Sequence, residues 1–253
     1  MPTRKNDPDN LTVIGHLDEL RKRIIYVLAY LTAGTIAGFY LAKALIRILE
    51  IPASAAAQNF ILLKPTEVVS IYFKVALYIG VVLSSPAIVY NSWEYVKPAV
   101  PKDINISLTG WAASAGFLFC AGSFFSFKIL LPAGYTFLMG LSKEIAVPMI
   151  TLNSYISFAL SVIVIGGFIF EMPLISALLT RFRLITPALL KSKRREAIFA
   201  LCVIAAVVTP TTDVFNMLLF AVPMIALFEL SIVVSSVMTG IYIKDGDRDS
   251  YGN

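Results

Sequence analysis

Residues 152–180 read LNSYISFALSVIVIGGFIFEMPLISALLT, an apolar stretch interrupted by a single charged residue, Glu171. A helix needs about 20 apolar residues to cross a hydrocarbon core that is about 30 Å thick. This stretch is long enough for one complete membrane span. It therefore indicates that the chain enters a lipid bilayer, and the rest of the sequence decides how many times it crosses.

The composition of the whole chain is that of an integral membrane protein. Of its 253 residues, 58% are hydrophobic and 15% are charged, against about 25% charged in soluble domains. The mean hydropathy is +0.79. High apolar content, 14 Gly, 13 Pro and two Cys exclude disorder, a collagen-like repeat and a disulfide scaffold. We expect an all-α polytopic membrane protein with one integral membrane domain over residues 1–253.

Charged residues divide the apolar stretches, because each one at mid-bilayer costs about 2.5–3.5 kcal/mol on insertion scales. We expect six spans, at residues 24–42, 75–93, 104–127, 152–180, 197–210 and 214–230. The fifth and sixth spans are short and meet at a tight turn at Pro210. A helix of about 16 residues covers about 24 Å, so either local thinning of the bilayer or snorkelling of flanking polar side chains has to compensate.

The positive charges are distributed unevenly between the two sides of these spans. Fifteen of the 21 Lys and Arg residues fall on the side that holds both chain ends. Cytoplasmic loops carry the excess of Lys and Arg, so both termini are expected in the cytoplasm. Loops of this kind and anionic lipid account for the net charge of +5 without nucleic acid as a partner. The first span is expected to be retained, because residues 24–42 are too long for a signal-peptide core.

The sequence offers little that could support catalysis or metal binding. His16 is the only histidine and precedes the first span, and the two cysteines, Cys120 and Cys202, lie in different spans. These residues cannot supply the usual ligands of a metal site or a serine–histidine pair within the membrane. We expect neither an enzyme nor a cofactor.

An amphipathic helix is expected over residues 10–23, ahead of the first span. On its polar side, Glu19 precedes Arg23 by four residues, a spacing that favours an ion pair within the helix. Two interpretations follow: the helix is a solvated element at the membrane surface, or Glu19 is available to accept an incoming cation.

Glu171 is the most informative single residue within the expected spans. It lies ten residues before Arg181, which places it about 15 Å along a helix and near the bilayer midplane. Pro173 removes a backbone donor and is expected to kink the helix there. A functional polar group is one interpretation, and a protonated carboxyl that bonds to a neighbouring helix is the other.

Asp213 either caps the sixth helix or takes part in transport, and Glu229 is expected near the cytoplasmic surface.

Several short motifs occur in a fixed order over residues 12–240. They are His16-Leu17-Asp18-Glu19-Leu20-Arg21-Lys22-Arg23, Pro65-Thr66-Glu67, Ser85-Pro86-Ala87-Ile88-Val89-Tyr90 with Trp93 and Pro98-Ala99, Phe170-Glu171-Met172-Pro173-Leu174, Thr209-Pro210 with Asp213, and Ala221-Val222-Pro223 with Phe228-Glu229. In this order and spacing they resemble the C subunit of the twin-arginine protein translocase, the TatC family.

The resemblance implies a glove-like, concave receptor of six spans in the cell membrane, with a thylakoid or other organelle membrane as the alternative location. Members of the family recognise twin-arginine signal peptides and take part in transport of folded proteins driven by the proton-motive force. The implied partners are these peptides, single-span subunits of the TatA and TatB type, membrane lipid, and further copies in a larger complex. The competing hypothesis is a proton- or ion-coupled small-solute transporter with Glu171 as its midplane site.

The resemblance also assigns roles to individual residues. It implies that Glu19 helps to bind the arginine pair, within a motif that includes His16, Leu17 and Arg21, and that Glu171 and Pro173 lie in the concave face. The usual second acid falls at Ile104 here, so the adjacent Asp103 is expected to serve, with Glu94 as a less favoured substitute. The remaining matched positions are Pro52, Glu67, Tyr95, Pro210, Asp213 and Glu229.

Overall fold

A computed structural model describes residues 13–54, 60–96, 108–145, 149–209 and 213–250. Over these ranges the chain is helical apart from short connections and one isolated bridge between Ile61 and Thr151. The expected all-α fold is therefore confirmed. The helices are α1 (Val13–Ser54), α2 (Thr66–Val96), α3 (Leu108–Phe125), the π-helix η2 (Ser126–Leu130), α4 (Leu131–Ile145), α5 (Leu152–Phe170), α6 (Met172–Arg181), α7 (Pro187–Ser192), α8 (Arg194–Val208) and α9 (Val214–Ser250).

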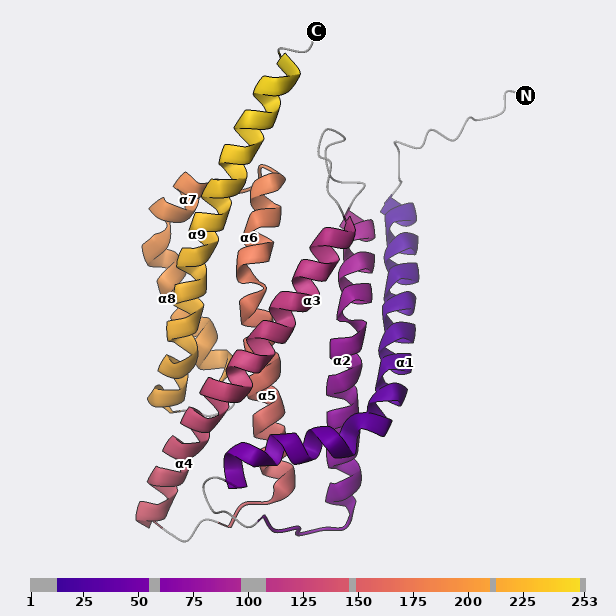
Figure 1. The fold of residues 1–253 in the computed structure, drawn as a ribbon, viewed down its shortest axis with the longest axis vertical. Coiled ribbons are helices and arrows are strands. Elements are labelled where there is room, and N and C mark those ends of the chain that lie inside the picture. The colour runs from indigo at the N-terminus through magenta and orange to yellow at the C-terminus, as the bar shows by residue number, and fades with distance from the viewer. Residues whose placement is uncertain (1–12, 55–59, 97–107, 146–148, 210–212, 251–253) are drawn as a thin grey trace, which may run out of the picture.

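Figure 1 shows a bundle in which α1 and α2 lie side by side at one edge and α8 and α9 at the other. The combined helix of α3, η2 and α4 crosses the bundle obliquely in front of α5. The start of α1 and the end of α9 lie at the same end of the molecule. This arrangement agrees with an even number of crossings between them.

Five segments of the described chain are long and apolar enough to cross a membrane: Leu17–Pro52, Thr66–Tyr95, Gly110–Ser142, Leu152–Arg181 and Val214–Thr239. α8 has only 15 residues, about 22 Å of helix, so it is shorter than the hydrocarbon core. Residues 210–212, where the turn at Pro210 is expected, lie outside the described residues.

The first two long helices pack with their backbones close together. A Cβ atom added at Gly38 would overlap the carbonyl oxygen of Ala76, and one added at Gly80 would lie 2.5 Å from the hydroxyl of Thr35. Small residues at helix crossings in membranes allow this close approach, which increases van der Waals contact between helices. The lower part of α1 then bends and lies across one end of the bundle (Figure 1).

The helix that carries the third expected span does not end where its charge pattern suggested. We expected it to stop at Phe127, before Lys128, but the helix continues through Lys128 into α4. The Lys128 side chain is exposed, and its amine lies 5.9 Å from the centre of the Phe127 ring. An exposed lysine can extend its flexible stem along the apolar surface, so this charge does not have to end the helix.

The sixth span also belongs to a longer helix than expected. We placed its end at residue 230 on account of Glu229, but α9 runs for 37 residues. The Glu229 carboxylate accepts a hydrogen bond from Arg194 of α8 at 2.8 Å, and both side chains are nearly half exposed. An exposed and paired charge keeps much of its hydration, so it costs little desolvation energy and the helix can continue through it.

Polar contacts join helices across the core. The Tyr155 hydroxyl of α5 donates to the carbonyl of Leu49 in α1 at 2.6 Å, and both side chains are buried. Between α6 and α9 the hydroxyls of Thr180 and Ser235 lie 2.7 Å apart. Hydrogen bonds between membrane helices contribute about 0.6 kcal/mol on average, so they orient these helices more than they hold them together.

Candidate functional site

Glu19 lies in the second turn of α1, ahead of residues 24–42, where the first span is expected. Its carboxylate accepts a hydrogen bond from the Arg23 guanidinium at 3.3 Å, so the ion pair expected from the spacing is confirmed. The same guanidinium nitrogen lies 3.5 Å from a carboxylate oxygen of Glu94 in the last turn of α2. Two acids from different helices therefore converge on one arginine.

The structure describes only some of the other residues that we expected at this site. Leu17 and Arg21 are exposed on α1, and Tyr95 is partly buried beside Glu94. The structure does not describe the His16 side chain, and Asp103 lies within residues 97–107, outside the described residues. The role expected for Asp103 thus stays a prediction.

The other family-matched residues do not join this cluster. Pro52 lies at the end of α1 and Glu67 in the first turn of α2, both at the opposite end of these two helices from Glu19 and Glu94. One carboxylate oxygen of Glu67 is buried without a hydrogen-bond partner among the described residues. The site residues therefore form separate groups along the bundle.

Glu171 lies at a break between two helices. α5 ends at Phe170 and α6 begins at Met172, so the helix is interrupted next to Pro173, where we expected a kink. The backbone continues through the break, because the Glu171 carbonyl accepts from the amide of Ile175 at 2.9 Å. The Glu171 side chain is half-buried, and its carboxylate makes no hydrogen bond or ion pair within the part of the chain that the structure describes.

This geometry bears on the two interpretations of Glu171. A purely structural carboxyl would be bonded to a neighbouring helix, since an unpaired polar group inside a membrane is costly. The described helices offer Glu171 no such partner. The arrangement favours a group that is kept available for a ligand, a partner or a proton.

Asp213 caps α9, the first of the two roles left open by the sequence. Its Oδ1 atom accepts from the backbone amide of Asn216 at 2.7 Å, and its Oδ2 atom accepts from the Asn216 side chain at 2.9 Å. An aspartate that bonds to the amide three residues on satisfies one of the unpaired donors at a helix N-terminus.

The cap predicts a modest effect on stability. We expect Asp213→Ala to lower the free energy of unfolding by about 1 kcal/mol, because the amide of Asn216 loses its acceptor. Thermal unfolding of the purified protein in detergent measures the change. Asp213→Ser is the matched control, since serine also caps helices. Equal losses in both variants would contradict the capping role.

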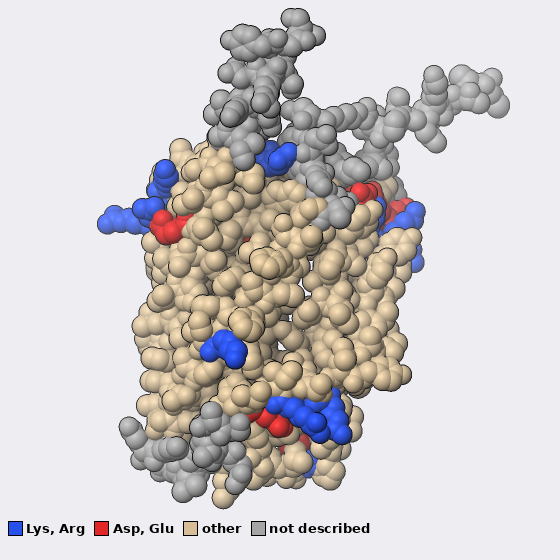
Figure 2. All heavy atoms as spheres, viewed as in Figure 1, with Lys and Arg blue, Asp and Glu red and all other residues tan. Residues whose placement is uncertain are grey.

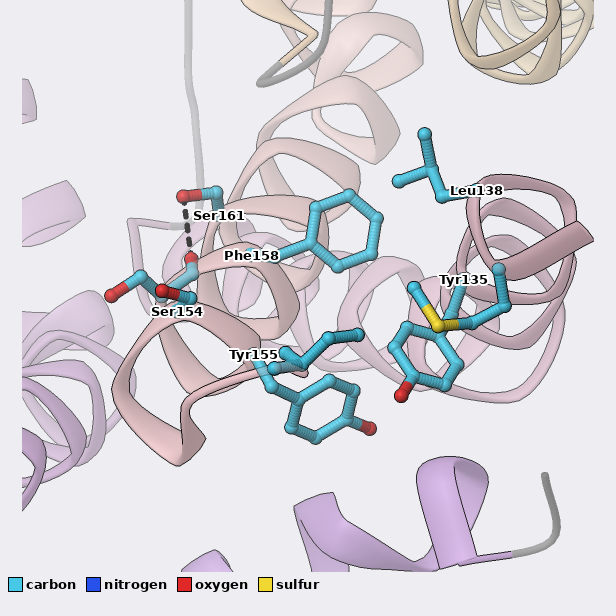
Figure 3. Close-up of a pocket in the computed structure, with 9 residues that line it drawn as sticks. Tyr135, Leu138, Ser154, Tyr155, Phe158 and Ser161 are labelled. Atoms are coloured by element: carbon cyan, nitrogen blue, oxygen red, sulfur yellow. Dashed lines mark hydrogen bonds between the residues drawn. The ribbon is translucent and has the colours of Figure 1, made fainter. Parts of the chain in front are cut away.

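A cavity of about 380 Å³ lies between α4 and α5. Figure 3 shows Leu138 facing Phe158 and Tyr135 lying beside Tyr155, and three serines of α5 also line the cavity. The Tyr135 hydroxyl is buried and has no hydrogen-bond partner among the described residues. Ser157, which also lines the cavity, accepts from the amine of Lys74 at 2.8 Å.

The cavity and Lys74 were not anticipated from the sequence, where Lys74 only marked the edge of a span. Asn153 accepts a second hydrogen bond from the Lys74 amine at 2.9 Å. Ser157 lies in the second turn of α5, at the opposite end of this helix from Glu171.

Charged side chains are sparse over the middle of the molecule. Figure 2 shows blue and red groups mainly near the two ends, with a broad tan surface between them. In the described residues, no group of three or more His, Cys, Asp or Glu side chains could hold a metal ion. The two described cysteines are free.

The fold and these side chains define a multi-pass helical membrane protein with an acidic pair at one end and an unpaired acid between its helices. The family model described as Sec-independent protein translocase protein (TatC) matches residues 15–223. The chain belongs to this family.

Individual relatives extend the match over most of the chain. It is 36% identical over 229 residues to the TatC protein of Aquifex aeolicus (strain VF5), covering 88% of this chain and 94% of that protein. It is 34% identical to TatCy of Bacillus subtilis (strain 168), covering 90% and 89% respectively. A crystal structure titled as the twin arginine translocase receptor TatC superposes with a TM-score of 0.76 at 34% identity, covering 88% of this chain and 99% of that one.

Proposed function

We propose that this chain is the receptor and core subunit of a twin-arginine translocase, which binds twin-arginine signal peptides and takes part in transport of folded proteins driven by the proton-motive force. Family membership supports the proposal. The observation that carries it is the Glu19 carboxylate, which already holds a guanidinium group, that of Arg23. Guanidinium presents a planar fork of donors that suits a carboxylate.

The site would act by charge and geometry, without chemistry on the peptide. Signal arginines would contact Glu19 at the cytoplasmic end, and Asp103 would assist from the loop after α2. The apolar part of the signal would then lie along the concave side of the bundle near Glu171 and Pro173. His16, Leu17 and Arg21 would complete the contact surface around the arginine pair.

One binding comparison tests this proposal directly. The purified chain is mixed with an immobilised peptide that carries the twin-arginine motif and with its Lys-Lys variant. We expect the arginine peptide to be retained about tenfold better, since a lysine offers a point charge without the bidentate fork, a difference of about 1.4 kcal/mol. Equal retention of both peptides would refute the receptor function.

The topology belongs to the same proposal. We place both termini in the cytoplasm and assign α8 as the fifth of six crossings. The 15 residues of α8 would leave about 7 Å of a 30 Å core unmatched, which would thin the bilayer beside α8 and α9. Single-span partner subunits and further copies of this chain would assemble around the bundle.

Glu171 gives a prediction that separates transport from binding. We expect Glu171→Ala to reduce export of a twin-arginine reporter about tenfold, the effect of losing one hydrogen bond to a charged group, about 1.5 kcal/mol. The preference for the arginine peptide over its Lys-Lys variant should stay at the wild-type level, because the arginine pair is bound at Glu19, which lies on another helix near the start of α1.

The measurement is the ratio of exported to retained reporter in cells that lack their own copy of the protein. Glu171→Gln is the informative companion, because it keeps the hydrogen-bonding side chain and removes only the charge. Export at the wild-type level with Glu171→Ala would show that the carboxyl is structural.

A further inference from the structure

The last turns of α1 have two chemically different sides. Ala42, Ile46 and Leu49 are buried against the bundle, and the carbonyl of Leu49 accepts a hydrogen bond from the Tyr155 hydroxyl of α5 at 2.6 Å. These contacts fix the part of α1 that lies across the end of the bundle (Figure 1). The opposite side of the same turns therefore faces outward in a defined orientation.

The outward side carries two cations. Lys43 and Arg47 are exposed and lie four residues apart, so their side chains are neighbours on the helix surface. Neither forms an ion pair within the part of the chain that the structure describes. Glu50 is the one acid of residues 40–51, and it is partly buried. Figure 2 shows basic side chains, with an acidic group beside them, gathered over the crossing part of α1.

Apolar and aromatic side chains accompany these cations. Tyr40 is 87% exposed, and Ile48 and Ile51 are also exposed. Basic helices that lie in the plane of a bilayer place such side chains among the acyl chains and let lysine and arginine reach the headgroups. The crossing part of α1 runs transverse to α2 and α5 in Figure 1, which is the orientation that this arrangement requires when the other helices span the membrane.

The general distribution of charge does not account for Lys43 and Arg47. The excess of Lys and Arg lies on the side that holds the chain ends, as is usual for cytoplasmic loops, whereas these two bases lie at the opposite end of α1. An uncompensated phosphate suits a pair of cations. A zwitterionic headgroup suits it less, because its own cation is repelled by both bases.

We propose that Lys43 and Arg47 form a binding site for the headgroup of an anionic phospholipid, in the leaflet opposite the chain ends. The phosphate lies between the two cations, and the acyl chains run along the outward side of residues 40–51. The inference stands on the geometry of α1 and does not depend on binding of a signal peptide.

A tryptophan reporter measures which lipid lies beside the site. Ala44→Trp puts it at an exposed position between the two bases, in a full chain whose Trp93 and Trp111 are replaced by phenylalanine. The protein is reconstituted into bilayers of phosphatidylcholine and phosphatidylglycerol, in which one lipid or the other carries brominated acyl chains that quench tryptophan fluorescence. We expect the relative binding constant to favour phosphatidylglycerol about fivefold for each cation that acts on the headgroup.

Removal and reversal of the charge change this preference in steps. With Lys43→Gln and Arg47→Gln together the preference falls to about one, and with Lys43→Glu and Arg47→Glu it falls below one. A distorted fold would not produce this graded response to charge. The matched control is Lys191→Gln with Lys193→Gln, which removes two exposed bases at the end of α7 and leaves the preference at the reporter unchanged.

Three results would overturn the proposal. The first is equal quenching by the two brominated lipids when Lys43 and Arg47 are present. The second is a preference for phosphatidylglycerol that persists in the double glutamine variant, because another part of the bundle would then supply it. The third is a reporter that neither lipid quenches, since residues 40–51 would then face water or another protein.

Discussion

Replacing Glu19 with alanine should weaken binding of a twin-arginine signal peptide by about 10- to 100-fold, the equivalent of about 1.5–3 kcal/mol for a hydrogen bond to a charged group. The carboxylate is partly buried and already pairs with the Arg23 guanidinium, so its interaction with a second guanidinium is less screened than that of a surface acid. Site-specific crosslinking of a radiolabelled precursor, alongside a dissociation constant for the isolated peptide, measures the loss.

The control for Glu19→Ala comes from the same helix. Glu50 is also a partly buried acid on α1, but it lies near the end of the helix rather than the start. Glu50→Ala should leave crosslinking unchanged, while Glu19→Asp should retain part of it because the charge remains. Crosslinking of the Glu19→Ala protein at the wild-type level would remove Glu19 from the site.

Replacing Gly38 with valine should lower the free energy of unfolding by about 3 kcal/mol or more. The added side chain would overlap backbone atoms, so the two helices would have to move apart. A side chain at Gly38 would overlap the backbone carbonyl oxygen of Ala76 in α2. The two helices are equally close at Gly80 of α2, where an added Cβ atom would overlap the backbone of Thr35. A loss of this size corresponds to a fall of about 6–12 °C in the Tm of a chain of this length.

The matched control is Gly140→Val in α4. A Cβ atom at Gly140 would meet nothing within 4 Å, and this glycine is exposed. Valine has a higher helix propensity than glycine, so the Tm of this variant should stay constant or rise slightly. The readout is thermal unfolding in one detergent, with protein recovery after membrane extraction as a second measure. A similar Tm for both variants would contradict the close packing of α1 on α2.

Most of the membrane architecture could be predicted from the positions of charges. The rule worked at residues 152–180, because the helical stretch there ends at Arg181. At residues 75–93 it did not, because α2 runs through both bounding charges, Lys74 and Glu94. It failed at Lys128 and Glu229, since a charge can stay on a helix when its side chain extends along the surface or pairs with another helix, as Glu229 does with Arg194. Sequence spacing carries no information about such partners, and the ends of these helices were therefore misplaced.

The candidate site residues were predictable only in part, for a related reason. Glu19 and Glu171 could be found from one-dimensional features, a charge spacing of four and an isolated acid in an apolar stretch. The convergence of Glu94 on Arg23 depends on how α2 packs against α1. The cavity beside Tyr135 depends in turn on how α4 packs against α5. Neither arrangement could be derived before the helices were placed.

The π-helix η2 determines which side chains of α4 face the cavity. A π-turn accommodates one residue more than an α-turn, so every side chain after residue 130 is rotated by about 100° relative to an uninterrupted continuation of α3. That rotation brings Tyr135 and Met139 round to α5, where they line the cavity with Ser157. Deleting a single residue within 126–130 would therefore shorten the helix by only one residue, yet it would turn all of α4 toward a different neighbour.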